Sequence, residues 1–224
     1  MIRTLCATMA LTLAGLGVAH AGPPTEFLEA QVRAVRDVLA VPVKAGTPEE
    51  AASNDKLKAI INPVMKFEDL SERALRKHWP TLSAPQKARF VALFRELVFH
   101  NYLKQVRSAN EDYTIVYEDE EAKGRKAASV TAIAKTRKAE IELVFHLTTE
   151  NGKVWVAEDI VIDEVSLVEN YREQFNKIIS KDGFEALLKK MADKLVDLGG
   201  KVPAEAAAEP AAPTTPPPAM KKAP

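Results

Sequence analysis

The chain has 224 residues, of which 46% are hydrophobic and 28% are charged, as in ordinary globular proteins. Its 31 basic and 31 acidic residues cancel, so the composition argues against a nucleic-acid-binding protein with a basic surface. One moderate-sized domain with a normal hydrophobic core is therefore expected.

Residues 1–21 have the pattern of a signal peptide. Arg3 provides a short positive region, an apolar stretch follows, and A-H-A at residues 19–21 matches a cleavage motif. The apolar stretch is shorter than the ~20 residues that a membrane-spanning helix needs. The sequence thus predicts an exported protein cleaved after residue 21. Cleavage would remove Cys6, the only cysteine, and with it any disulfide or cysteine-based site.

Apolar residues at helical spacing predict an amphipathic helix over residues 25–41. We expect the polar residues 44–55 to form a link. Apolar positions at 57–64 then lead into a second helical pattern at 66–79, which a proline closes.

The next predicted helix starts at a capping-box pattern, Ser83 with Gln86, and runs to about Val106. Its apolar residues cover one side and extend onto the other, where Phe99 and Leu103 lie. Either this is a central helix packed between two layers, or one of its sides faces an internal cavity.

The hydrophobic period then changes to two, which indicates strands. Four strands are expected, at residues 112–119, 125–136, 139–150 and 153–165. Asn151-Gly152 is a strong hairpin signal, and the short connections predict an antiparallel meander. Simple alternation in the last strand places Trp155 on the opposite face from Ile160.

Ser166 and Glu169 form a second capping box before a one-faced helix that Asp182-Gly183 ends, and a further one-faced helix continues to Leu198. Two such helices after a one-faced sheet predict a helical layer folded over that sheet. The expected fold is α+β: a meander of four strands or slightly more, covered on one face by N- and C-terminal helices. This domain would span residues 22–198, followed by a disordered Pro/Ala-rich tail at 199–224.

Catalytic chemistry is hard to find in the sequence. It contains none of the common nucleophile, phosphate-binding or zinc motifs, and we expect no enzyme activity, metal or cofactor. His78, His100 and His146 lie in different elements, which argues against a shared metal site. The neighbouring carboxylates Glu158 and Asp159 alternate across a strand and so do not form a glycosidase pair.

Two segments carry a family resemblance. VSLVENYREQFNKIISKDGFEALLKKM, residues 165–191, resembles the C-terminal signature of the periplasmic phospholipid-carrier family, the MlaC or toluene-tolerance proteins. The segment at residues 67–103 is similar to that family's other characteristic region, and the likeness covers about residues 25–198. The Pro/Ala-rich tail lies outside the family pattern.

The resemblance implies a soluble periplasmic carrier without enzymatic activity. It would hold phospholipid acyl chains in an apolar pocket between sheet and helices and carry the lipid between outer and inner membranes. Its implied partners are an inner-membrane ABC transporter complex with a lipid-binding ring and an outer-membrane lipoprotein complex.

The pocket implied by the resemblance would be lined by residues of the long helix, the sheet and the signature helix. The expected lipid-binding residues are Phe94, Val98, Tyr102, Leu143, Phe145, Trp155, Leu167, Tyr171 and Phe175. Arg137 and Lys138 are candidates for the pocket rim or a docking surface.

Three alternatives remain open. In the first, the cargo is a polycyclic lipid such as a hopanoid. In the second, the protein is an adaptor with a solid core. In the third, it is a periplasmic hydrolase, whose candidate nucleophile would be Ser129, the only serine within the predicted strands. A continuous internal cavity would separate a carrier from an adaptor. A hydrolase would need a buried nucleophile and base converging in that cavity.

Overall fold

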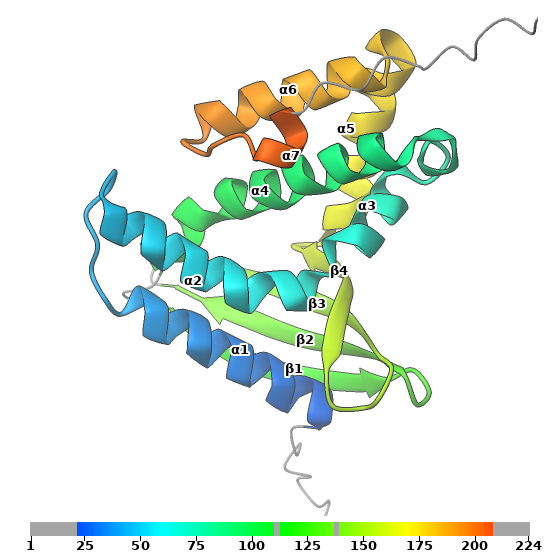
Figure 1. The fold of residues 1–224 in the computed structure, drawn as a ribbon. Coiled ribbons are helices and arrows are strands. Elements are labelled where there is room, and N and C mark those ends of the chain that lie inside the picture. The colour runs from blue at the N-terminus through cyan, green and yellow to red at the C-terminus, as the bar shows by residue number, and fades with distance from the viewer. Residues whose placement is uncertain (1–21, 110–112, 137–138, 208–224) are drawn as a thin grey trace, which may run out of the picture.

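The computed structural model describes residues 22–109, 113–136 and 139–207. It is an α+β fold in which helices flank a five-stranded antiparallel open sheet, so the predicted fold class is confirmed (Figure 1). The strands follow one another in chain order from β1 to β5, which makes the sheet a meander.

The N-terminal layer consists of α1 (Pro23–Leu39) and α2 (Pro48–Met65). The prediction of a polar link at 44–55 is wrong from residue 48 onward, because Thr47 caps α2 and its hydroxyl accepts a hydrogen bond from the Glu50 N–H. Proline at the first helical position and acidic residues in the first turn favour a helix start, although the segment is polar.

Two short elements and one long helix follow: α3 (Phe67–Leu75), the 3-10 turn η1 (Trp79–Thr81) and α4 (Ala84–Ala109). The predicted capping box before α4 is confirmed. The Ser83 N–H donates to Gln86 Oε1 over 3.1 Å, and the Gln86 N–H donates to Ser83 Oγ over 3.4 Å.

The sheet comprises β1 (Thr114–Ala122), β2 (Ala127–Lys135), β3 (Glu140–Thr149), β4 (Trp155–Ile162) and β5 (Val165–Ser166). The predicted turn at Asn151-Gly152 is confirmed, and Gly152 has a φ of +73°. The Asn151 side chain accepts hydrogen bonds from the N–H groups of Lys153 and Val154, which shapes the loop between β3 and β4.

A β-bulge in β4 changes the face on which Trp155 lies. His146 pairs with Asp159 and Leu147 pairs with Ala157, so Glu158 is an extra residue in β4. The bulge brings Trp155 onto the same face as Ile160, and the prediction that they point to opposite faces is wrong. Trp155 is accordingly 6% exposed.

The C-terminal helices are α5 (Leu167–Asp182), α6 (Phe184–Asp197) and α7 (Ala204–Ala207). Ser166 caps α5 as predicted, since its hydroxyl accepts a hydrogen bond from the Glu169 N–H over 3.0 Å. Gly183, with φ +87°, separates α5 from α6.

The positions of α6 and α7 differ from the expectation. Helix α5 packs on β4, but α6 packs on α4 and α5, beyond α4 as seen from the sheet, instead of over the sheet itself (Figure 1). Helix α7 lies after the predicted domain end at residue 198 and packs on α4, with Ala206 buried. Residues 208–224 of the predicted tail lie outside the described part of the chain.

The hydrophobic core has two clusters. The larger one joins the helix-facing side of the sheet mainly to α3, α4, α5 and α6, and it also includes Leu28 of α1, Met65 of α2 and Ala206 of α7. The smaller one is centred on Leu39, Leu57 and Phe99, from α1, α2 and α4. Helix α4 takes part in both clusters, so both interpretations of its two apolar sides hold in part.

Candidate functional site

A cavity of about 160 Å³ lies between α2 and α4, next to β4. Its lining comes from five elements: Leu57, Ile61, Asn62, Met65, Phe67, Val98, Phe99, Tyr102, Leu103, Val106, Ile160, Ile162 and Leu167. On α2 and on α4 these residues recur at intervals of three and four, the spacing that brings side chains onto one helical face. The cavity is therefore formed by two apolar helix faces that do not fully close on each other.

The lining is almost purely apolar. Only Asn62 and Tyr102 among these residues bring a polar side chain, and none brings a carboxylate, an amine or an imidazole. Burial raises the pKa of the Tyr102 hydroxyl above its ordinary value, so this group stays neutral at physiological pH. Such a cavity accommodates hydrocarbon and offers no nucleophile and base for catalysis.

The size of the cavity limits what this conformation can hold. An apolar cavity near 150 Å³ takes up a molecule of about the size of benzene, and pockets for larger organic ligands span roughly 300–1,000 Å³. The observed 160 Å³ is thus enough for a short stretch of one acyl chain. Enclosing a whole lipid requires the walls to move apart.

Polar contacts connect the two walls outside the lining. Lys58 Nζ on α2 lies 2.6 Å from Glu96 Oε2 on α4 and 5.0 Å from the centre of the Phe99 ring. Arg107 Nη2 on α4 donates to Asn54 Oδ1 on α2 over 2.7 Å. The Lys58 and Glu96 side chains are only 22% and 14% exposed, so their attraction is less screened than that of a surface pair.

His100 adjoins the same ion pair. Its Nε2 lies 3.7 Å from Glu96 Oε2. Burial, and after it the positive charge of Lys58, lowers the pKa of His100 below its ordinary value, against the opposing effect of Glu96. The neutral imidazole is therefore the favoured form beside this pair.

The structure brings three of the predicted lipid-binding residues, Val98, Tyr102 and Leu167, into the lining of one cavity. Phe94, by contrast, packs within an aromatic cluster, with its ring centre 5.0 Å from that of Tyr171 and 5.6 Å from that of Phe175. Those three rings form solid core in this conformation.

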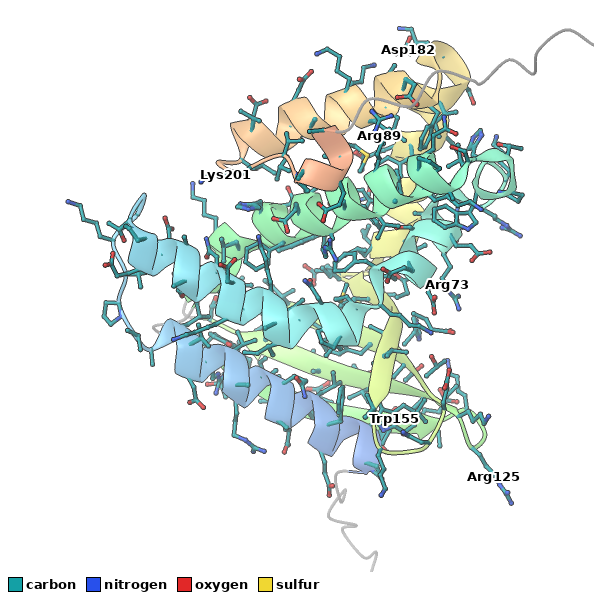
Figure 2. The ribbon with its side chains drawn as sticks, viewed as in Figure 1. Arg73, Arg89, Arg125, Trp155, Asp182 and Lys201 are labelled. Atoms are coloured by element: carbon teal, nitrogen blue, oxygen red, sulfur yellow. The ribbon has the colours of Figure 1, made fainter. Side chains whose placement is uncertain are left out.

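The predicted residues of the sheet lie outside the lining of the cavity. Leu143 and Phe145 are half-buried on the helix-facing side of β3. Trp155 lies at the start of β4, next to the β3–β4 loop (Figure 2). Contact of these residues with lipid stays a prediction. Arg137 and Lys138 lie outside the described residues.

Sequence reasoning missed the contribution of α2. Leu57, Ile61 and Met65 supply one wall of the cavity, and their spacing of four is a helical signal in the sequence. Because residues 44–55 were interpreted as a link, α2 was not predicted as a full helix. Ile160 and Ile162 of β4 also line the cavity.

The hydrolase alternative finds no support in the cavity. Ser129 Oγ does lie 3.0 Å from His146 Nδ1, but on the sheet face opposite to the one that carries Phe145 and Ile160. Asp159, next to His146 in the sheet, accepts hydrogen bonds from the Val168 N–H and the Ser166 hydroxyl at the start of α5. Its carboxylate therefore holds a helix end.

Neither a metal centre nor a membrane span is found in the described part of the chain. No group of three or more His, Cys, Asp or Glu residues there is placed to hold a metal ion. No helix within the same residues is both long enough and apolar enough to cross a bilayer.

Comparison with known proteins gives one matching family model and several matching solved structures. The family model described as MlaC protein matches residues 29–193. Among solved structures, the phospholipid-binding protein from Ralstonia solanacearum, solved in complex with a phospholipid, has a TM-score of 0.67 and 19% sequence identity. The match covers 80% of this chain and 99% of that one. A search of curated proteins found no match.

Proposed function

The chain belongs to the MlaC family, and from this premise we propose that it is a periplasmic carrier that encloses the acyl chains of a phospholipid between α2, α4 and β4. The observation that carries the proposal is the apolar cavity, which lies between sheet and helices in a fold shared with a protein solved with bound phospholipid. A solid-core adaptor would have no need of such a space.

Enclosure follows from the energetics of lipid transfer. Burying one methylene group is worth about 0.8 kcal/mol, so two long acyl chains with roughly 28 methylenes would lose on the order of 20 kcal/mol if left in water. A surface groove recovers only part of this. We therefore propose that the 160 Å³ cavity is the closed form of a larger pocket, and that lipid entry separates α2 from α4.

The α1–α2 layer is the wall best suited to move. It contacts α4 at a small apolar cluster and at the Lys58–Glu96 and Arg107–Asn54 contacts, and it gives the large core two buried residues, Leu28 and Met65, whereas α4, α5 and α6 each give the large core more. Pro63 in α2 has no N–H to donate to the preceding turn of the helix, which weakens the end of α2 beside the cavity.

The wider role that we propose is transport of phospholipid between the two membranes. The predicted signal peptide would place the chain in the periplasm, and the partners would be an inner-membrane ABC transporter complex and an outer-membrane lipoprotein complex. Neither step requires catalysis by this chain. Transfer of a fluorescent phospholipid from donor to acceptor vesicles, accelerated by the purified protein, is the expected activity, and no acceleration would contradict it.

The direct test is native mass spectrometry of the mature chain, purified without detergent and incubated with phospholipid vesicles. We expect a bound mass equal to one or two phospholipids. A bare protein mass after incubation would support the adaptor alternative, and extraction of a polycyclic lipid from the purified protein would support the hopanoid alternative.

Two substitutions and a control locate the binding site. Leu103→Trp fills the cavity and Val98→Glu places a charge in it, so both should remove the bound lipid. Val196→Glu is the matched control, because Val196 is 58% exposed on α6 and its replacement should leave lipid binding unchanged. A folded Leu103→Trp variant with full lipid content would contradict this site.

A further inference from the structure

Glu120, on β1, caps the start of α1 from the sheet. Its Oε2 accepts hydrogen bonds from the Thr25 N–H over 3.0 Å and from the Thr25 hydroxyl over 2.6 Å. Gly22, the residue before α1, has no side chain that could cap the helix. Glu120 pairs with the fully buried Val130 in the sheet and so lies on the helix-facing side. A carboxylate from a distant strand thus holds the start of the N-terminal layer on the sheet.

The same carboxylate lies directly against Gly22. A Cβ added at Gly22 would be only 1.9 Å from Glu120 Oε1. Covalent geometry places that Cβ about 2.5 Å from the Gly22 nitrogen, so this nitrogen lies within roughly 4.4 Å of Oε1. Within the described part of the chain, Oε1 accepts no hydrogen bond and no basic side chain forms an ion pair with Glu120. The carboxylate can therefore accept a charged partner beside the Gly22 nitrogen.

Removal of the predicted signal peptide would turn this nitrogen into such a partner. In the uncleaved chain it is the nitrogen of a neutral peptide bond. Cleavage after residue 21 makes it the α-amino group of the mature chain, and most of an ordinary α-amino group is protonated at pH 7. A positive charge at the start of a helix opposes the helix dipole, and a carboxylate at the same place offsets this cost. Glu120 is the side chain placed to do so.

We infer that the α-amino group created by signal-peptide removal binds the Glu120 carboxylate, and that this ion pair fixes the start of α1 on the sheet. The premise is the cleavage after residue 21 that the sequence predicts, and the inference does not depend on the lipid cargo. The pair cannot form in the precursor, whose Gly22 nitrogen carries no charge. Processing itself would thus strengthen the attachment of the N-terminal layer in the exported chain.

The experiment is a double-mutant cycle measured by urea unfolding. The mature chain, which begins at Gly22, is compared with a chain that retains residues 19–21 and so carries its amino group elsewhere. Each is made with Glu120 and with Glu120→Gln, which keeps an oxygen acceptor for Thr25 and removes the charge. We expect Glu120→Gln to lower the ratio of folded to unfolded protein roughly two- to fivefold more in the mature chain, the range of a partly exposed ion pair.

Glu121→Gln is the matched control. Glu121 follows Glu120 on β1, is exposed, and pairs with Ser129 on the opposite face of the sheet. Its replacement makes the same change in net charge and should affect both chains equally.

A second measurement follows the amino group itself. Only the neutral amine reacts with an acylating reagent, and a neighbouring carboxylate favours the protonated form. Acylation of the α-amino group of the mature chain, followed by mass spectrometry of the N-terminal peptide, should therefore be several-fold slower with Glu120 than with Glu120→Gln. The Glu121→Gln variant should react at the wild-type rate.

Three results would overturn the inference. N-terminal sequencing of the exported chain could show a first residue other than Gly22, which would place the amino group elsewhere. Glu120→Gln could have the same effect on unfolding in both chains, or it could leave the acylation rate unchanged. Lipid binding does not enter these measurements, so the carrier proposal stands or fails separately.

Discussion

The side of α4 that faces α5 and α6 is filled by aromatic rings, whereas the side that faces α2 borders a cavity. On the filled side, the Phe90 ring centre lies 5.3 Å from that of Phe175 and 6.2 Å from that of Phe184. On the other side, α2 and α4 meet at a small cluster and at a few polar groups. One helix thus belongs to a filled core and to the wall of a cavity.

Under the proposed function, the difference explains how a small protein can hold a lipid and remain folded. If the pocket were in the main core, filling and emptying it would change the contacts that keep the chain folded. If the cavity opens by movement of the α1–α2 layer, as we propose, that movement is confined to a layer that gives the main core only Leu28 and Met65 as buried residues. Elements that move for function are generally those with fewer apolar contacts.

We expect the largest effect on stability when phenylalanines on the two sides of α4 are replaced by alanine. Phe94→Ala should lower the free energy of unfolding by about 3–5 kcal/mol, because Phe94 is fully buried among packed rings. Phe99→Ala should cost roughly 1–2 kcal/mol less, because Phe99 already borders empty space and loses fewer contacts. Urea unfolding measures both. Equal losses would mean that the two sides are packed alike.

The sequence indicated that α4 has two apolar sides. It did not indicate which side packs solidly and which side borders a cavity. The apolar residues on both sides of α4 predicted either two packing layers or a cavity, and the capping patterns at Ser83 and Ser166 located two helix starts. Which side would be solid depended on the partners of α4. The rings of Tyr171 and Phe175 belong to a distant segment, and only the folded structure shows that they fill the space beside Phe94.

Two elements of the candidate site, α2 and β4, were predicted incorrectly for local reasons. The first half of α2 was not predicted as a helix, because its polar residues show no hydrophobic periodicity before Leu57. The bulge at Glu158 reversed the alternation in β4, and an inserted residue of this kind has no signature in a simple alternating pattern.

Two glycines allow a second comparison of the two regions: Gly200 lies against the main core, and Gly22 lies at the start of the N-terminal layer. A Cβ added at Gly200 would lie 2.2 Å from Leu195 Cδ1, a side chain that is fully buried in the main core. A Cβ added at Gly22 would lie 1.9 Å from Glu120 Oε1, the end of a flexible side chain on β1. Gly200→Ala should therefore cost about 1–3 kcal/mol, as overpacking of a filled core does.

For Gly22→Ala we expect a loss below about 1 kcal/mol. The Glu120 carboxylate can move aside, at the expense of the hydrogen bonds that its Oε2 accepts from the N–H and hydroxyl of Thr25. Urea unfolding measures both variants. A greater loss at Gly22 than at Gly200 would show that the N-terminal layer is the less tolerant of the two regions.

A substitution at Lys58 tests the ion pair between α2 and α4, and we expect a smaller effect on stability. Lys58→Met removes the partner of Glu96, whose side chain is 14% exposed, and should destabilise the protein by about 1–2 kcal/mol. The double variant Lys58→Met/Glu96→Gln should recover part of this loss, because no unpaired carboxylate remains. If α2 is the moving wall, Lys58→Met should also accelerate lipid uptake from vesicles. Arg89 provides the control.

Arg89→Met breaks contacts on the filled side of α4. Arg89 Nη1 lies 2.9 Å from Glu185 Oε2 on α6, and its Nε donates to the Ala206 carbonyl on α7 (Figure 2). We expect this variant to leave the rate of lipid uptake unchanged even if it lowers stability. Faster uptake in Arg89→Met would show that general loosening, and not release of α2, controls entry.

The smallest expected effect is a pH dependence at the boundary between the two regions. His100, on α4, faces Glu96 and Lys58, with Glu50 as a more distant charge, and its pKa is lowered chiefly by burial. A histidine with a lowered pKa in the folded state binds fewer protons there than in the unfolded chain, so folding stability falls as the pH drops below about 6.5, the ordinary value. The loss is complete once the pH is below the folded-state pKa.

His100→Gln removes this titration while every other group still titrates, so the difference between the two proteins isolates His100. We expect the free energy of unfolding of the wild-type chain to decrease more steeply than that of the variant as the pH is lowered from about 7.5 to 5.5. Urea unfolding at several pH values measures both slopes. Since protonated His100 would add a positive charge beside Lys58, acid should also loosen the α2 wall and accelerate lipid uptake in the wild type only. Parallel stability curves would show that His100 keeps its proton affinity on folding and that the boundary does not respond to pH through this residue.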